Sequence, residues 1–351
     1  MDSRRYAIAC ALASAALFGA STPFAKLLLG EVSPWLLAAI LYLGSGLGLA
    51  AWLALRPFGF RAERIPSLAR GDWPWLAGAI VAGGIAGPVL LMFGLALTDA
   101  GSAALLLNLE AVLTAAIAWT AFRENVDRRV FLGMLAIVAG GVLLAWEQAP
   151  RAGSVAGPLL IAAACLAWAI DNNLTRKVSG GDAVFIAALK GLSAGGVNLA
   201  LAFAAGASLP GPGALVAAGL LGLLGYGVSL VLFILALRGL GTARTGAYFS
   251  VAPFFGAALA VVLLGERPTE LFWVAAVLMA SGVWLHFTER HAHLHAHDAI
   301  EHVHEHVHDT HHRHAHDSLW DGREPHAHHH RHEPLVHLHP HYPDLHHRHP
   351  H

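Results

Sequence analysis

Polar positions along this chain fall between long apolar blocks, and many of these blocks are apolar on every face of a helix. A bilayer core about 30 Å thick needs roughly 20 apolar residues per helix, and each block approaches that length. The breaks between blocks carry turn residues, as in Asp99–Gly101 and the run SLPGPG. The pattern therefore predicts an all-α integral membrane protein with ten transmembrane helices. The predicted spans are 6–29, 34–55, 73–97, 103–122, 130–147, 156–174, 183–206, 214–237, 245–264 and 269–288.

The composition agrees with a membrane protein. The chain is 56% hydrophobic and 13% charged, against about 25% charged in an ordinary soluble domain. Its first apolar run could be mistaken for a cleaved signal peptide, but it continues to about Leu29, which is longer than a signal core. We therefore interpret it as the first membrane helix.

The basic residues predict the orientation, because cytoplasmic loops carry an excess of lysine and arginine. With the N-terminus inside, only Arg151 and Arg267 fall outside. An even number of spans then places both termini in the cytoplasm, and we expect the inner membrane of a cell. The residues on the predicted cytoplasmic side are Arg4, Arg5, Arg56, Arg61, Arg64, Arg70, Arg123, Arg128, Arg129, Arg176, Lys177, Arg238 and Arg244.

The chain also repeats itself. Residues 101–146 and 241–287 both open with Gly-Ser/Thr-Ala, run through an apolar block to a glutamate and end in a helix with Gly-Val. A fainter match joins FGASTPFAK at 18–26 to WAIDNNLTR at 168–176. Five spans per half make the second half run inverted, which is a secondary-transporter architecture. The predicted domains are a first repeat at 1–147, a second at 148–289 and a tail at 290–351.

The doubled pattern resembles the EamA-type drug/metabolite transporter superfamily. The motifs are LNLEAV and SVAPFF, each followed by FREN or LGER and a Gly-Val-ended helix, over about residues 5–288. The resemblance implies ten helices, two inverted five-helix repeats and a central cavity, in a family that exports amino acids, metabolites or drugs. This chain has Ala111 where the family usually has proline, while the second repeat keeps Pro253. A helix break is therefore better supported in the ninth span than in the fourth.

Ionisable groups inside spans are costly and so are candidate functional residues. Glu110 lies in the fourth span with Asn108 nearby. It is cheap to bury when protonated and needs a partner or water when ionised, which makes it a candidate for proton coupling or for binding a substrate amine. The alternative is a structural carboxyl that hydrogen-bonds a neighbouring helix.

Other polar residues lie at paired positions of the two halves. Asp171 and Asn172 in the sixth span correspond to Ser21 and Thr22 in the first, and such paired interruptions point to a transport site. The alternative for Asp171 is a salt bridge to Arg176 or Lys177 at the cytoplasmic helix end.

Four further candidates lie in the seventh, eighth and ninth spans. Lys190 could bind an anionic group, pair with Glu110 or Asp171, or extend to the inner interface. Asn198, Tyr226 and Tyr248 complete the candidate substrate and coupling residues, with ordinary packing as the alternative for the tyrosines.

The tail from Arg290 holds all but one of the 25 histidines and few apolar residues, so we expect it to be disordered. Neutral imidazoles suit Zn²⁺, Ni²⁺, Co²⁺ and Cu²⁺, and closely spaced pairs predict several metal sites of modest affinity. A solvated spacer or a pH-responsive segment are the alternatives. The candidate ligands are His302, His304, His306, His308, His311, His312, His314, His316, His328, His329, His330, His346 and His347.

These features favour a gradient-driven exporter of a small metabolite or drug-like solute, with a metal-binding regulatory tail. One alternative is an exporter of Ni²⁺, Co²⁺ or Zn²⁺ whose tail collects cytosolic ion, and another is a membrane-anchored metal buffer or sensor. An enzyme is not expected, because the chain has no GxxxxGK[ST], no HExxH and no spaced nucleophile–base pair. We expect no required cofactor and no nucleic-acid partner; the partners are the solute or ion, the bilayer and metal at the tail, and a homodimer is left open.

Overall fold

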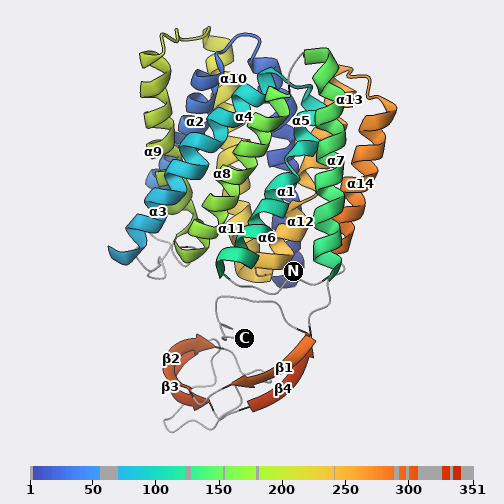
Figure 1. Cartoon of the computed structure of the whole chain (residues 1–351). Coiled ribbons are helices and arrows are strands. Elements are labelled where there is room, and N and C mark those ends of the chain that lie inside the picture. Colours follow the sequence, from blue (N-terminus) through green and yellow to red (C-terminus); the bar gives the residue numbers. More distant parts are fainter. Residues whose placement is uncertain are drawn as a thin grey trace. The chain divides into compact units, whose positions relative to one another are not determined.

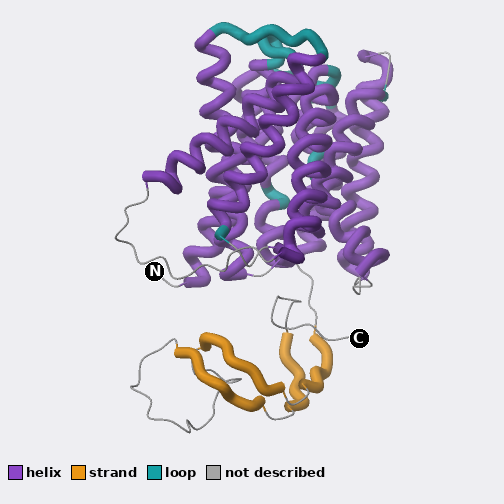
Figure 2. Tube along the Cα trace, turned by 90° about the vertical axis from the view of Figure 1, so that its left-hand side faces the viewer, coloured by secondary structure: helices purple, strands orange, loops and turns teal. Residues whose placement is uncertain are grey.

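The computed structural model describes residues 3–55, 70–122, 128–152, 155–178, 182–240 and 242–287, together with four short strands between 292 and 340. The helical unit is a bundle of roughly parallel and antiparallel helices (Figures 1 and 2). The helices are α1 (Ser3–Leu28), α2 (Pro34–Leu55), η1 (Arg70–Asp72), α3 (Trp73–Ala79), η2 (Ile80–Ala86), α4 (Gly87–Ala96), α5 (Ala100–Leu106), α6 (Leu109–Phe122), α7 (Arg128–Ala152), α8 (Ala156–Val178), α9 (Ala183–Ala204), α10 (Pro212–Leu221), η3 (Gly222–Val228), α11 (Ser229–Leu240), α12 (Thr242–Phe249), α13 (Ala252–Leu264) and α14 (Glu270–Phe287).

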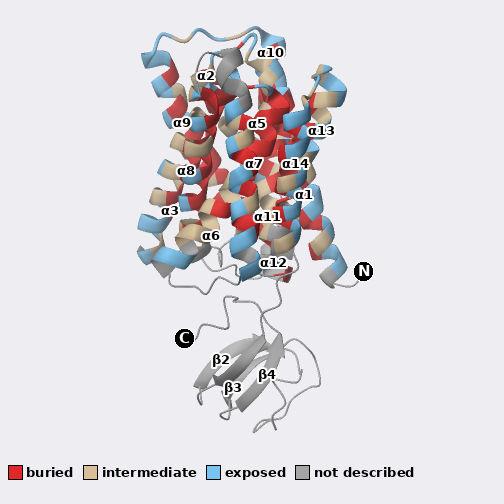
Figure 3. Cartoon of the chain, turned by 45° about the vertical axis from the view of Figure 1, so that its right-hand side comes forward, coloured by how far each residue is buried: buried red, intermediate tan, exposed pale blue. Residues whose placement is uncertain are grey.

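The described helices fit a membrane protein. Seven helical stretches are long and apolar enough to cross a bilayer, and they coincide with seven of the predicted spans. The other three predicted spans contain shorter apolar helices, Phe131–Trp146, Ala252–Leu264 and Glu270–Leu285. Buried residues lie along the inside of the bundle while large apolar side chains are exposed on its outside, as lipid contact requires (Figure 3).

Two π-helical segments lie at corresponding positions of the two halves of the chain, each between two α-helices of one predicted span. The segment η2 joins α3 to α4, and η3 joins α10 to α11. Pro88 is the second residue after η2 and has no N–H to donate to the carbonyl of Gly84 four residues earlier. Backbone carbonyls are therefore left for side chains of other helices to bond, which is how π-bulges often come to serve functional sites.

The fourth and ninth predicted spans are both broken. The break between α12 and α13, before Pro253, confirms the prediction for the ninth span. The fourth span, where a break had less support from the sequence, is broken as well, since α5 ends at Leu106 and α6 begins at Leu109. The Asn108 side chain explains this break without proline: its Nδ2 donates to the carbonyl of Leu105 at 3.0 Å, and the backbone N–H of Asn108 bonds the same carbonyl at 3.0 Å.

Helices of the two halves pack against each other in a repeated arrangement. The helix α2 packs on α9, and α7 packs on α14. The pairs α1 with α11 and α4 with α8 form a second matching set, as do α1 with α13 and α6 with α8. Close approach depends on small residues at one of these crossings, because a Cβ at Gly191 would lie 2.6 Å from the backbone nitrogen of Gly46.

The histidine-rich tail is described only at four short strands. It contains two antiparallel two-stranded sheets, β1 (Ala292–His297) with β4 (Leu335–Pro340) and β2 (Ile300–His306) with β3 (His326–His332). In β1 and at residues 336–339 of β4, histidine alternates with Ala, Leu or Val, which has the period of a strand. A two-stranded sheet is only marginally stable in water, so these pairings need a further source of stability.

Candidate functional site

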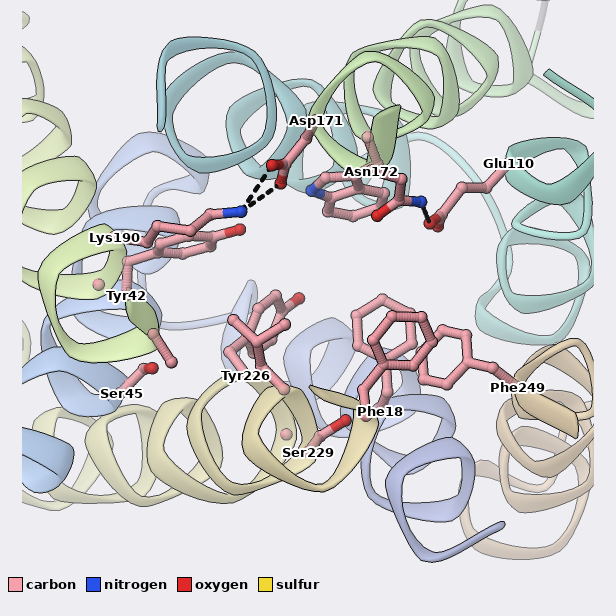
Figure 4. Close-up of a pocket in the computed structure, with 16 residues that line it drawn as sticks. Phe18, Tyr42, Ser45, Glu110, Asp171, Asn172, Lys190, Tyr226, Ser229 and Phe249 are labelled. Atoms are coloured by element: carbon pink, nitrogen blue, oxygen red, sulfur yellow. Dashed lines mark hydrogen bonds and ion pairs between the residues drawn. The ribbon is translucent and has the colours of Figure 1, made fainter. Parts of the chain in front are cut away.

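A cavity of about 110 Å³ lies inside the helical unit, enough for several water molecules. Its lining comes from both halves of the chain: α1, α2 and α6 from the first, and α8, α9, η3, α11 and α12 from the second. Figure 4 shows Lys190, Asp171, Asn172 and Glu110 along one side of the open centre, and Tyr226, Phe18 and Phe249 along the other. A cavity that combines a few polar groups with an apolar wall is the usual form of a small-molecule site.

Glu110 contributes a carboxylate from the first turn of α6. Its Oε1 accepts a hydrogen bond from Nδ2 of Asn172 on α8 at 2.7 Å (Figure 4). Among the residues that the structure describes, no cation forms an ion pair with Glu110, and both side chains are half-buried. The carboxylate is therefore held by a neutral amide and remains available to a proton or to a positively charged group.

A second carboxylate, Asp171, is neutralised by Lys190. The Lys190 Nζ donates to Oδ1 of Asp171 at 2.6 Å and to Oδ2 at 2.8 Å. Thr175 joins the pair, since its hydroxyl donates to Asp171 Oδ1 at 2.7 Å and accepts from Lys190 Nζ at 3.1 Å. The side chains of Lys190 and Asp171 are only 7% and 10% exposed, so the pair links α8 to α9 as a largely buried ion pair.

Side chains from three helices bond the carbonyls of η2. The Tyr42 hydroxyl donates to the Gly83 carbonyl at 2.7 Å, and Trp168 Nε1 donates to the same oxygen at 2.9 Å. Asn198 Nδ2 donates to the Gly84 carbonyl at 3.1 Å, in the place of the N–H that Pro88 lacks. The first two bonds fix the rings of Tyr42 and Trp168, which line the cavity. Asn198 does not line the cavity, but its bond holds the same η2 segment.

Aromatic rings form a connected wall of the cavity. Phe18 lies at the centre, with ring centroids 5.4 Å from Phe249, 5.8 Å from Tyr226 and 6.0 Å from Trp168. Phe233 extends the wall at 5.0 Å from Phe249. Tilted and edge-to-face pairs at these distances are favourable, which gives the wall a defined shape.

Half of the ten predicted substrate or coupling residues line this cavity: Glu110, Asp171, Asn172, Lys190 and Tyr226. The structure shows the mutual ion pair of Asp171 and Lys190. The side chains of Arg176 and Lys177, the other expected partners of Asp171, lie outside the described residues.

The other five predicted residues lie elsewhere among the described residues. Asn108 is buried at the break in the fourth span, where its Nδ2 also lies 3.9 Å from Met279 Sδ. Ser21 and Thr22 are buried, and Ser21 donates to the Phe18 carbonyl at 2.6 Å. Tyr248 packs near Cys10, and Asn198 bonds η2 as described above. None of these five residues lines the cavity.

Apart from Tyr226, the residues of the aromatic wall were not predicted from the sequence. Phe18 and Trp168 occupy the same place in the faint repeat that paired Ser21 with Asp171, so that alignment held a usable signal for both. Tyr42 and Phe249 carried no such signal, because an aromatic residue in an apolar span is as suitable for lipid contact as for a cavity.

The side chains of the tail histidines lie outside what the structure describes, but the backbone register places several of them opposite one another. His302 faces His330, His304 faces His328 and His306 faces His326, while His329 faces Val303. The remaining predicted metal ligands lie outside the described residues: His308, His311, His312, His314, His316, His346 and His347.

Replacing Gly83 with alanine is expected to destabilise the protein by about 1–3 kcal/mol, because the added methyl group would collide with the Asp171 carboxylate. The matched control is Gly196→Ala on α9, where nothing lies within 4 Å of the added Cβ. That change should be neutral or slightly stabilising, as alanine favours helix over glycine. Unfolding of both variants in detergent checks the difference, and equal stability would contradict the close packing of η2 on α8.

A membrane-helix bundle with a polar cavity built from both halves of the chain defines a membrane transport protein. The EamA-like transporter family model matches the chain twice, over residues 5–146 and 155–288. The chain therefore belongs to the EamA-like transporter family.

Curated relatives and a solved structure are also similar to this chain. An uncharacterized transporter of Methanothermobacter thermautotrophicus is 27% identical over 281 residues, covering 76% of this chain and 82% of that protein. A probable 4-amino-4-deoxy-L-arabinose-phosphoundecaprenol flippase subunit ArnE of Pseudomonas paraeruginosa is 38% identical over 114 residues, covering 31% of this chain and 92% of that protein. A crystal structure superposes with a TM-score of 0.60 at 22% identity, covering 81% of this chain and 97% of the other, and it supports the fold alone.

Proposed function

We propose that this chain is a secondary transporter whose ten predicted spans form two inverted five-helix repeats around the cavity. Three features support the repeat: η2 and η3 fall in corresponding spans, the fourth and ninth spans are both broken, and the family model matches twice. The matching helix pairs between the halves support it as well. Alternating access in such folds is largely a rocking of the repeats around a fixed site.

The proposed orientation places both termini in the cytoplasm of a cell with the protein in its inner membrane. In the helical unit, α2, α6, α8 and α11 end at the same end of the bundle at which α1 begins (Figure 1). Arg5, Arg70, Arg128 and Arg129 belong to helix termini at that end, as the positive-inside rule requires of a cytoplasmic face. Asp171 and Lys190 each lie seven positions from the α8–α9 connection, so the site is roughly 10 Å deep from that face.

The proposed activity is export of a small organic solute driven by a proton gradient. The observation that carries it is Glu110, a carboxylate without an ion-pair partner among the described residues, in a cavity with an aromatic wall. A carboxylate in this setting can exchange a proton for a solute, and the rings supply apolar contact for the solute's body. One relative is named as a flippase subunit for a lipid that carries an amino sugar, so cargo with an amine occurs among similar proteins.

The tail is proposed to bind Ni²⁺, Co²⁺, Zn²⁺ or Cu²⁺ and to regulate transport. The opposed histidines of β2 and β3 support this, since directly opposite residues have Cβ atoms about 4.5–5.5 Å apart, close enough to share a metal. The same tail favours a second candidate function, in which the cargo is the divalent metal and the tail collects it.

Flux into proteoliposomes separates the candidates, comparing the full chain with one that stops at Arg290, the boundary of the second structural unit. For an organic-solute exporter, a panel of metabolites should give flux with or without the tail. Flux of Ni²⁺, Co²⁺ or Zn²⁺ that is lost on truncation would establish the second candidate instead. Tight metal binding without flux of any solute would leave a membrane-anchored metal buffer and exclude both.

A further inference from the structure

The charges in the cavity do not cancel. Three residues with formal charge line it: Glu110, Asp171 and Lys190. The Lys190 ammonium group is bonded to both carboxylate oxygens of Asp171, so this cation is not free to neutralise Glu110. Glu110 Oε2 accepts no hydrogen bond from the described residues, while Oε1 is bonded only by Asn172. With Glu110 ionised, the lining therefore carries one net negative charge and an open carboxylate oxygen.

The rest of the lining suits a positive charge attached to an apolar body. Phe18, Phe249 and Tyr226 lie across the open centre from Glu110 and Asn172 (Figure 4). Aromatic faces attract ammonium groups within about 6 Å, and the attraction grows where water is excluded. An anionic solute would meet only Lys190, whose ammonium group already has two carboxylate oxygens and one hydroxyl as partners.

We propose that the transported solute is a monovalent organic cation with an apolar body, such as an aryl-alkyl amine. This proposal rests on the transport function above and names the class of its substrate. The ammonium group binds Glu110 through Oε2, and the apolar body contacts Phe18 and Phe249. A proton and the cation compete for Glu110, so its occupation by one excludes the other.

The test is equilibrium binding to the full chain in detergent, with three probes that share one aromatic body and differ in charge. The probes are 2-phenylethylammonium, neutral 2-phenylethanol and anionic 3-phenylpropionate. Binding followed by the fluorescence of Trp168, which lines the cavity, should be roughly tenfold or more tighter for the cation than for the other two. Glu110→Gln should weaken cation binding by roughly tenfold to hundredfold and leave the alcohol nearly unaffected.

Two matched controls separate the site from general effects. Glu31→Gln is the control for Glu110→Gln, because it makes the same chemical change at an exposed position. Phe24→Leu, at an exposed position of α1, is the control for Phe249→Leu in the aromatic wall. Phe249→Leu should weaken cation binding by roughly threefold to tenfold, and neither control should change it.

The outcomes also distinguish this inference from the proposed transport function. Equal binding of all three probes, or preference for the anion, overturns the inference even if the protein transports solutes. Cation-selective binding that depends on Glu110, without flux of any solute, upholds the inference and overturns the transport function. A Glu110→Gln variant that folds and binds the cation as wild type overturns the assignment of Glu110.

Discussion

Replacing Glu110 with glutamine is expected to abolish the coupling of solute flux to a pH gradient and to reduce flux by roughly tenfold to hundredfold. In the structure, Asn172 Nδ2 donates to Glu110 Oε1 at 2.7 Å, and the Oε1 of a glutamine can accept the same hydrogen bond. Glutamine also has nearly the same volume as glutamate. The cavity should therefore persist. The variant loses the negative charge and the exchangeable proton, because an amide neither ionises nor binds a proton in the accessible pH range.

The measurement is uptake of 2-phenylethylammonium into proteoliposomes at acidic, neutral and alkaline pH, with and without an imposed pH gradient. Glu31→Gln serves as the control, because Glu31 is an exposed carboxylate in the connection between α1 and α2. The titratable side chains that also face the cavity are Tyr42, Asp171, Lys190 and Tyr226, and they are unchanged in both variants. Full, pH-dependent flux in the Glu110→Gln protein would rule out a coupling role for this residue.

The charged part of the site could be predicted because each charge interrupts an apolar span. Glu110, Asp171 and Lys190 are costly in a bilayer, so their mere presence identified them as candidates. The pairing of Asp171 with Lys190 also follows from the sequence. Two antiparallel helices joined by a short connection place residues that lie equally far from the connection at the same depth. Asp171 lies seven positions before the end of α8, and Lys190 lies seven after the start of α9.

The aromatic wall and the π segments could not be predicted from the same pattern. Phe18 and Phe24 lie on the same helix, yet Phe18 faces the cavity while Phe24 is 41% exposed on the outside. Nothing in their residue type distinguishes the two, since both a lipid and a cavity wall accept phenylalanine. The helix break at Asn108 was not predicted, because the prediction of breaks considered only proline. A side-chain amide that bonds a backbone carbonyl can break a helix as well.

Replacing Lys190 with methionine is expected to lower the free energy of unfolding by about 3–5 kcal/mol, which would be the largest stability effect of a single change in the cavity. Methionine keeps the length and apolar stem of lysine but removes the cation that holds Asp171. The Asp171 carboxylate would then be buried with only the Thr175 hydroxyl as a described side-chain partner. An unpaired charge in such a site must be protonated, hydrated by local opening or left at high cost.

The double variant Asp171→Asn/Lys190→Met determines whether charge is the cause. With both partners neutral, no ion is left unpaired, so most of the loss in the single variant should be recovered, because replacing both members of a buried pair is often nearly neutral. Unfolding of wild type, both single variants and the double variant in detergent gives the coupling between the two positions. A double variant as unstable as Lys190→Met alone would show that the loss comes from packing between α8 and α9. Recovery would show instead that the ion pair is retained to neutralise Asp171, which leaves Glu110 as the one carboxylate of the lining with an open oxygen.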